Sequence, residues 1–438
     1  MTENQSILII CDNFLIGGRE TYIETCLSQL SSQPQNQLKK NDEASYTASL
    51  LANKIDARFT STLFSKTIAV ENHDSLLAWL DAGGNVISQQ RPTCIWAHHY
   101  ALLPAFLLAV EYELPLVVSL HGAPFTAGKY TSLSDRLGFS LAAQQKASFT
   151  AVSEEIREQM VSLGFNKNNV TLTRNAVAKH EVGNRLLEKQ NSNSKECILL
   201  TRPQKLAHIR ESVLLCSMLN QLGLATNLAV YLGYSLNQSQ MVSKSKFLGR
   251  KWLLKNPHVL KYLHRINIQP PAMDKQKIID QADIVLGMGR VVLEGIMAKK
   301  PTVLIGYDAV KGLVTSANFS EYQYSNFSGR NIQSSTVREV GKQVMAHYPA
   351  ANDRQQTSQQ LSQQQYDSIS VPVLCEKLHG IFQQAPIIES VENDCRQDIS
   401  LFKNAKINEE QLLNKLASGL SNEYQRVLSR LEKEAHNE

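Results

Sequence analysis

Short apolar runs alternate with longer helical patterns along most of the chain. Apolar residues spaced three or four apart predict helices near 19–31, 74–90, 101–112 and 153–163, and then near 208–221 and 290–298. Between them, short runs are typical of strands buried on both faces: Ser6–Ile10, Cys94–Ala97, Leu116–Leu120, Phe149–Val152, Cys197–Thr201, Leu228–Leu232, Ile284–Leu286 and Thr302–Ile305. Strands that alternate with helices form parallel sheets, so we predict two doubly wound α/β domains in tandem.

A polar stretch between the two sets of elements predicts the domain boundary. We expect an N-terminal domain over residues 1–180, a linker over 181–196, a second domain over 197–385 and a tail over 386–438. Leucines from Leu412 to Leu431 recur at helical spacing in the tail. This predicts an amphipathic helix that docks on the body of the protein or, through 409–433, on a second copy or a partner.

Composition narrows the class of protein. The chain has 438 residues, of which 43% are hydrophobic and 19% charged, as in a globular protein of two or three domains. A net charge of +5 over this length does not indicate nucleic-acid binding. The start of the sequence lacks the basic and long apolar regions of a signal peptide, so we expect a cytoplasmic protein. The seven cysteines are scattered, which favours neither a zinc ribbon nor a disulfide framework.

Glycine and polar residues follow several of the predicted strands. Ligands of doubly wound sheets bind beyond the carboxyl ends of the strands, so these residues are the candidates for function. If the two sheets face each other, the candidates converge on one cleft. They are Gly17, Gly18, His98, His99, His121 and Ser153 in the first domain, and Arg202, Gly287, Met288 and Gly289 in the second.

The segment Ala282–Pro301 gives the strongest local signal, because a strand ends in a glycine pair and a helix begins at once. We expect the N–H groups of residues 289–292 to point outward at the positive end of the helix and to suit a diphosphate. Glu294 shares a face with Arg290, and its carboxylate suits the two hydroxyls of a ribose. The alternative is a tight turn with a surface glutamate.

Cations and histidines supply the remaining candidates. Arg202 and Lys205 follow a strand and suit two adjacent phosphates, although they also suit plain surface charge. Gly17 and Gly18 either let a ligand approach the backbone or form an ordinary turn. The histidines lack HExxH spacing and local carboxylates, so we expect no metal. His121 is expected to contact a polar ligand or a hydroxyl proton.

Residues 244–265 contain seven lysines and arginines and no acid, with aromatic and aliphatic residues among them. This composition is typical of a solvated basic helix or a loop beside the phosphates. The alternative is peripheral contact with an anionic membrane, here the inner face of the plasma membrane.

Five segments in order resemble the family 4 glycosyltransferases. They are GGRETY; IWAHH with PLVVSLHG; FTAVSEEIREQMVSLGF with VTLTRNAV; ILLTRPQK; and ADIVLGMGRVVLEGIMAKKPTVLIG. The resemblance covers about residues 6–345 and leaves the tail outside. It implies the GT-B fold, in which two Rossmann-like domains face a cleft, here with a helical extension at the C-terminus.

The resemblance also implies a function, which is transfer of a hexose-type sugar from a UDP- or GDP-linked donor to a hydroxyl acceptor, with retention and without a metal or bound cofactor. The acceptor class is a glycan, a lipid-linked saccharide or a cell-surface polysaccharide. Catalytic roles fall to His121 at the transferred sugar and to Arg202 and Lys205 at the diphosphate. Donor contacts fall to Gly287, Met288, Gly289, Arg290, Val291 and Glu294, and the acceptor and diphosphate loop to Gly17, Gly18, His98, His99, Ser153 and Asn175.

Two positions depart from the family pattern. Leu286 stands where the family has a second carboxylate, eight residues before the ribose glutamate. Lys205 comes three residues after Arg202 instead of about five. Leu286 and the helical tail keep one alternative open, a catalytically inactive GT-B subunit that binds a partner transferase or a glycan. A GT-B sugar-nucleotide epimerase is a weaker alternative, because the carboxylate-rich catalytic set expected of it is not visible in the sequence.

Overall fold

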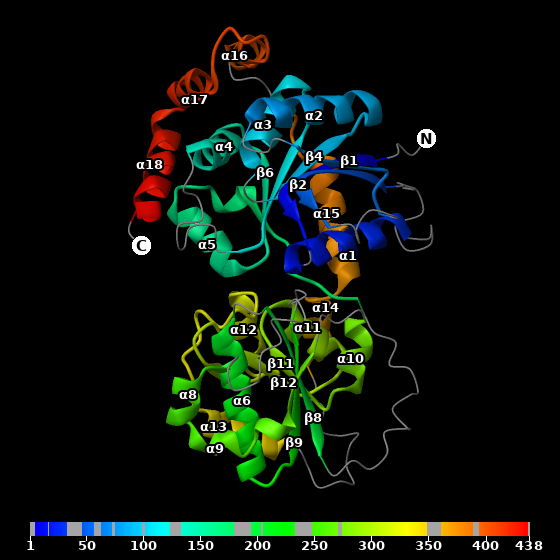
Figure 1. Cartoon of the computed structure of the whole chain (residues 1–438). Helices are drawn as coiled ribbons and strands as arrows, with labels where there is room; N and C mark the ends of the chain where they lie inside the picture. Colours follow the sequence, from blue (N-terminus) through cyan, green and yellow to red (C-terminus); the bar gives the residue numbers. More distant parts are fainter. Residues whose placement is uncertain are drawn as a thin grey trace. The chain divides into compact units, whose positions relative to one another are not determined.

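A computed structural model defines the fold (Figure 1). It describes residues 5–15, 17–32, 46–56, 63–71, 75–98, 101–122, 133–178, 194–202, 205–232, 248–269, 274–347, 361–388 and 394–436. The chain divides into two compact units. Unit 1 comprises Met1–Arg174 with Pro372–Glu438, and unit 2 comprises Asn175–Val371.

Unit 1 is built on a parallel sheet whose described strands run in the order β3-β2-β1-β4-β5-β6-β7. This is the strand order of a Rossmann-like sheet. The strands are β1 (Gln5–Phe14), β2 (Tyr46–Ile55), β3 (Lys66–Ala69), β4 (Cys94–His98), β5 (Leu116–Leu120), β6 (Ser148–Ala151) and β7 (Val170–Leu172). The helices from the N-terminal part of the chain are α1 (Gly18–Ser32), α2 (Leu76–Gln90), α3 (Leu102–Glu111), α4 (Leu133–Gln144) and α5 (Glu154–Ser162).

Helices cover both faces of this sheet, which explains why its central strands read as continuous apolar runs. Every residue of β4 and of β5 is buried. Helices α2, α3 and α4 pack in succession, and α1 lies with a later helix, α15, on the other face (Figure 1). Pro104 lies in the first turn of α3, where its missing N–H costs no hydrogen bond.

Unit 2 repeats the arrangement with the order β10-β9-β8-β11-β12-β13, in which β13 is antiparallel. Its strands are β8 (Lys195–Thr201), β9 (Thr226–Leu232), β10 (Ile266–Gln269), β11 (Ile284–Gly287), β12 (Thr302–Ile305) and β13 (Val310–Leu313). Its helices are α6 (Leu206–Gln221), α8 (Arg250–Lys255), α9 (Pro257–Leu260), α10 (Lys275–Gln281), α11 (Arg290–Met297), α12 (Phe319–Tyr324), α13 (Val337–Ala346) and α14 (Gln363–Asp367). The prediction of two doubly wound domains is therefore confirmed.

Helix α15 (Val371–Gln384) differs from the prediction, which put it in the second domain. The structure packs it on unit 1. The Phe382 ring lies 5.2 Å from the Trp96 ring, and His379 hydrogen-bonds the Tyr46 hydroxyl. Burial of these aromatic side chains against the unit 1 sheet stabilises the packing of α15 there, although α15 follows the unit 2 elements in the sequence.

The tail forms three helices instead of one. They are α16 (Asp394–Lys403), α17 (Glu409–Ser418) and α18 (Asn422–His436), and they pack on α3 and α4 of unit 1. Leu412, Leu416, Leu420 and Val427, predicted as the apolar face, are buried. Lys403 pairs with Glu111 at 2.7 Å, and Arg396 pairs with Glu113 at 2.6 Å. The amphipathic pattern thus docks on the body of the protein, one of the two outcomes expected for it.

The position of α15 predicts which unit a core substitution weakens. Phe382→Ala removes a buried ring and should destabilise unit 1 by about 3–5 kcal/mol while leaving unit 2 unchanged. Urea unfolding followed by hydrogen exchange in peptides from β1 and β8 separates the two units. Phe319→Ala, at an equally buried ring of unit 2, is the matched control and should weaken β8 protection only. Loss of protection in β8 for Phe382→Ala would contradict the assignment.

Candidate functional site

The carboxyl edge of the unit 2 sheet brings two of the predicted donor segments together. The loop after β8 carries Lys205, and the loop after β11 carries Met288. The Lys205 ammonium nitrogen lies 2.9 Å from the Met288 sulfur. Arg202 is exposed at the end of β8, and its carbonyl accepts a hydrogen bond from the Lys205 N–H at 3.0 Å. The cations predicted for phosphate are therefore neighbours on one turn.

The turn from β11 into α11 is tight. A Cβ at Gly287 would lie 2.6 Å from a methyl carbon of Val291, so a side chain there would push α11 away. Gly289 has φ of +59°, a left-handed conformation that favours glycine. Its N–H donates to the Phe327 carbonyl at 2.8 Å, and its carbonyl accepts from the Val292 N–H at 3.1 Å. Two of the four N–H groups predicted to point outward are thus engaged within the fold, which corrects that expectation.

Arg290 and Glu294 form an ion pair on the first turns of α11. The Arg290 Nε lies 3.0 Å from Glu294 Oε1, and both side chains are only 12% exposed. The Arg290 Nη1 also donates to the carbonyl of Ala176 at 2.8 Å. The pair keeps the carboxylate in one orientation, and a carboxylate has a second oxygen with which it accepts further hydrogen bonds.

Tyr307 lies beside the same loops and was not predicted. Its ring is 48% exposed on the loop after β12. The Lys205 ammonium lies 4.9 Å and the Arg330 guanidinium 5.8 Å from its centroid, within the range of a cation–π interaction. The His208 ring lies 6.2 Å away. Tyr307 follows the predicted strand 302–305, so reading the end of that strand as well would have found it.

Three buried polar atoms near this edge have no hydrogen-bond partner within the described part of the chain. They are Thr201 Oγ1 at the end of β8, His208 Nε2 in the first turn of α6, and Asn175 Oδ1 next to Ala176. Buried polar atoms are almost always hydrogen-bonded, because leaving one unpaired costs its full desolvation energy. Their occurrence together at one edge indicates a polar ligand.

Burial and, to a smaller extent, the nearby Lys205 cation lower the pKa of His208 to about 4. The imidazole is therefore neutral at pH 7 and carries one donor and one acceptor nitrogen. The sequence analysis missed His208, although it lies three residues after Lys205 and hence on the same face of the helix.

The carboxyl edge of the unit 1 sheet holds the other predicted residues that the structure describes. Gly18 begins α1, and a Cβ there would meet no atom within 4 Å. The carbonyl of Gly17 accepts from the Thr21 N–H at 3.1 Å. The next residue, Arg19, is largely buried and pairs with Asp12 and Glu20. This ion-paired cluster fixes the start of α1 against the end of β1.

His98 and His121 form a hydrogen-bonded pair, with 2.8 Å between His98 Nδ1 and His121 Nε2. The rings are stacked with centroids 5.0 Å apart, and the Tyr22 ring meets His121 edge-on at 4.7 Å. One nitrogen must donate and the other accept, so the two tautomers are linked. Among the residues described, no group of three or more His, Cys, Asp or Glu is arranged to hold a metal ion. His99 lies outside the described residues.

Ser153 caps helix α5. Its hydroxyl oxygen accepts a hydrogen bond from the Ile156 N–H at 3.3 Å, and the side chain is fully buried. Serine is a preferred N-cap residue because its hydroxyl pairs with an N–H group that the helix leaves open. The structure thus explains the presence of Ser153 by the start of the helix alone.

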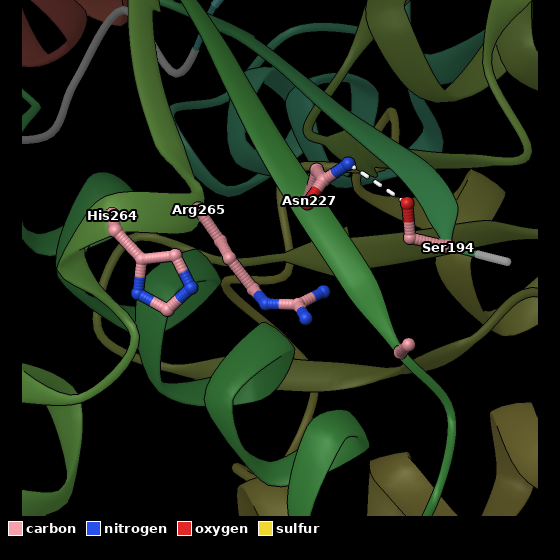
Figure 2. A pocket seen from close by; sticks show the side chains of 5 residues that line it. Ser194, Asn227, His264 and Arg265 are labelled. Carbon is pink, nitrogen blue, oxygen red and sulfur yellow. Dashed lines mark hydrogen bonds between the residues drawn. The ribbon is translucent and has the colours of Figure 1, made fainter. Parts of the chain in front are cut away.

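An open pocket of about 400 Å³ lies at the opposite edge of the unit 2 sheet, at the amino ends of β8, β9 and β10 (Figure 2). Its lining residues are Ser194, Ala225, Asn227, His264 and Arg265. Asn227 donates to the Ser194 hydroxyl at 3.0 Å. None of the predicted donor residues lines it.

The fold has known counterparts. A glycosyltransferase from Rickettsia africae is 12% identical in sequence, with 89% of this chain and 100% of that chain covered and a TM-score of 0.57. Anabaena Alr3699/HepE in complex with UDP is 12% identical, with 86% and 99% covered and a TM-score of 0.59. The UDP-GlcNAc 2-epimerase of Methanocaldococcus jannaschii is 11% identical, with 87% and 99% covered and a TM-score of 0.52.

No protein-family model matches the sequence, and a search of curated proteins gives no match. The structural likeness therefore shows the fold alone. Two Rossmann-like units with a helical C-terminal region give the chain the GT-B fold, as the sequence predicted.

The buried His208 predicts a pH dependence of stability. Its pKa is about 4 in the folded chain against 6.5 when unfolded, so the unfolded state binds a proton first as the pH falls. The stability that depends on the neutral imidazole is fully present above pH 6.5 and is lost progressively as the pH falls from 6.5 to about 4. Between these limits the free energy of unfolding of unit 2 should fall by about 3 kcal/mol more than in His208→Gln. Urea unfolding of both proteins across this pH range is the measurement, and parallel curves would contradict the prediction.

Proposed function

We propose that this protein is a glycosyltransferase that moves a sugar from a nucleoside diphosphate sugar to a hydroxyl group of a glycan or lipid-linked saccharide. The observation that carries the proposal is the contact between Lys205 and Met288, which joins the two predicted donor segments on one edge of unit 2. The oriented Glu294 carboxylate lies one turn inside α11, the helix that begins at that edge. The likeness to Anabaena Alr3699/HepE, solved with UDP and with UDP-glucose, supports a nucleoside diphosphate as the ligand class.

Each group at this edge has a chemical task in the proposed reaction. Glu294 uses its second carboxylate oxygen to accept hydrogen bonds from the ribose hydroxyls. Arg202 and Lys205 pair with the diphosphate, whose negative charge grows as the bond to the sugar breaks. Fixed cations that stabilise a leaving diphosphate lower the barrier electrostatically and replace a metal in that role. The reaction is accordingly proposed to be metal-independent.

Unit 1 supplies the group for the transferred sugar in this proposal. His121 contacts the sugar, and its hydrogen bond with His98 holds the ring and links the two tautomers. Gly18 leaves room beside the backbone for the acceptor or the diphosphate, and Gly17 precedes it on the same loop. The order of the five resembling segments supports a family 4 type of enzyme, and with it retention of the anomeric configuration.

Leu286 is the observation that supports the main alternative to a transferase. This residue is fully buried in the core of unit 2, where the resembling family has a carboxylate. Position 286 therefore supplies no carboxylate to contact a donor sugar. The alternative proposal is a GT-B subunit without turnover that binds a partner transferase or a glycan.

Release of nucleoside diphosphate tests the proposal. A panel of UDP-, GDP- and ADP-sugars is offered with and without a lipid and glycan extract. We expect release from one donor, unaffected by EDTA, and lost in Arg202→Ala. Glu294→Gln should lower kcat/KM by about 10–100-fold, because a hydrogen bond to a charged group contributes about 1.5–3 kcal/mol.

The control is Glu321→Gln, which changes an exposed carboxylate of α12 and should leave kcat/KM unchanged. A folded protein that releases nucleoside diphosphate from none of the donors would overturn the transferase proposal in favour of the subunit without turnover. An equal loss in Glu321→Gln and Glu294→Gln would remove Glu294 from the donor site.

A further inference from the structure

The basic segment between β9 and β10 is not used by the proposed reaction. Its described part forms α8, α9 and the short helical turn η5 (Leu263–Arg265). Leu253, Val259 and Tyr262 are buried and anchor these turns in unit 2. The exposed side chains form what we name the basic face, which consists of Lys251, Leu254, Lys255, His258, Leu260, Lys261 and His264.

Two leucines are conspicuous on the basic face because they are apolar and open to solvent. Leu254 is 70% exposed, more than any other large hydrophobic side chain in the described ranges, and Leu260 is 50% exposed. They lie on α8 and α9, which contact each other. Exposed leucines gain free energy only when they enter an apolar phase or interface.

The charged residues of the segment that carries these leucines have one sign. Residues 212–273 contain no aspartate or glutamate, and Lys251, Lys255 and Lys261 surround the two leucines along the chain. Helix α6, which packs against α9, adds Arg210, whose guanidinium lies 5.5 Å from the Trp252 ring centroid. The long stems of lysine let the ammonium groups reach toward phosphates while the leucines go deeper.

The pocket at the amino edge of the sheet continues this surface. His264 and Arg265 line it, one turn after Lys261, and Asn227 of β9 also lines it, with its amide turned toward Ser194 (Figure 2). An open pocket with a guanidinium and an amide suits a phosphate group.

We propose that the basic face, together with this pocket, binds the surface of an anionic lipid bilayer. The lysines and Arg265 pair with lipid phosphates, and Leu254 and Leu260 insert at the boundary between headgroups and acyl chains. The leucines favour a bilayer over nucleic acid, because a phosphate backbone would leave them in water. No helix in the described part of the chain is long and apolar enough to cross a membrane, and this mode of binding requires none.

Sedimentation with vesicles tests the proposal on the full chain. One set contains phosphatidylcholine mixed with phosphatidylglycerol, and the other contains phosphatidylcholine alone. We expect binding to the first set only. Lys251→Gln with Lys255→Gln should weaken it by about fivefold for each lysine, and Leu254→Ser with Leu260→Ser should weaken it by roughly tenfold or more.

Two control variants match these changes elsewhere. Lys277→Gln with Lys342→Gln removes two exposed charges from the same unit, and Leu133→Ser changes an exposed leucine of unit 1. Both should bind vesicles as the unchanged protein does. All of the substituted side chains are exposed, and thermal unfolding verifies that each variant folds.

Three results would overturn the proposal. They are equal binding to both vesicle sets, unchanged binding of the leucine variant, and an equal loss in the control variants. If RNA competes with vesicles and binds the leucine variant as tightly as the unchanged protein, the surface is a general polyanion site. That result also overturns the proposal. Nucleoside diphosphate release by the same variants is measured in parallel, so that the outcome is independent of the proposed transferase activity.

Discussion

The turn between β11 and α11 is the constraint on which the proposed donor site depends. Gly287 approaches Val291 so closely that any side chain would displace the helix, and Gly289 adopts a backbone conformation that other residues reach only with strain. Because α11 begins directly at the strand end, the ion pair of Arg290 and Glu294 stands at the sheet edge. Met288, between the two glycines, meets Lys205 from the neighbouring loop.

The electrostatics of this edge are matched to an anion with hydroxyl groups beside it. Lys205 and Arg330 flank Tyr307, and His208 remains neutral because it is buried and lies near a cation. Unpartnered polar atoms in the same place cost stability in the free chain. In the proposed function, a ligand that pairs with them recovers this cost.

Much of the fold could be predicted from local pattern, and the site only in part. The strands β1, β4, β5 and β6 and the helix α11 were predicted because doubly covered strands are apolar runs and caps are local signals. Helix α4 was missed because its large apolar residues, Leu137, Phe139 and Leu141, recur at every second position instead of at helical spacing, with small and polar residues between them. A Cβ at Gly138 would lie 2.4 Å from the Leu103 nitrogen. Tyr307 meets Lys205 across about a hundred residues of sequence, and the sheet order brings them together.

Hydrogen exchange with and without UDP tests the central claim, that the carboxyl edge of unit 2 binds a nucleoside diphosphate. The account predicts slower exchange in peptides covering residues 205–212 and 286–297, which contain the start of α6 and the turn into α11, and unchanged exchange in peptides covering 225–232 at the opposite edge. Protection at 225–232 with none in 286–297, or no protection in either, would contradict it.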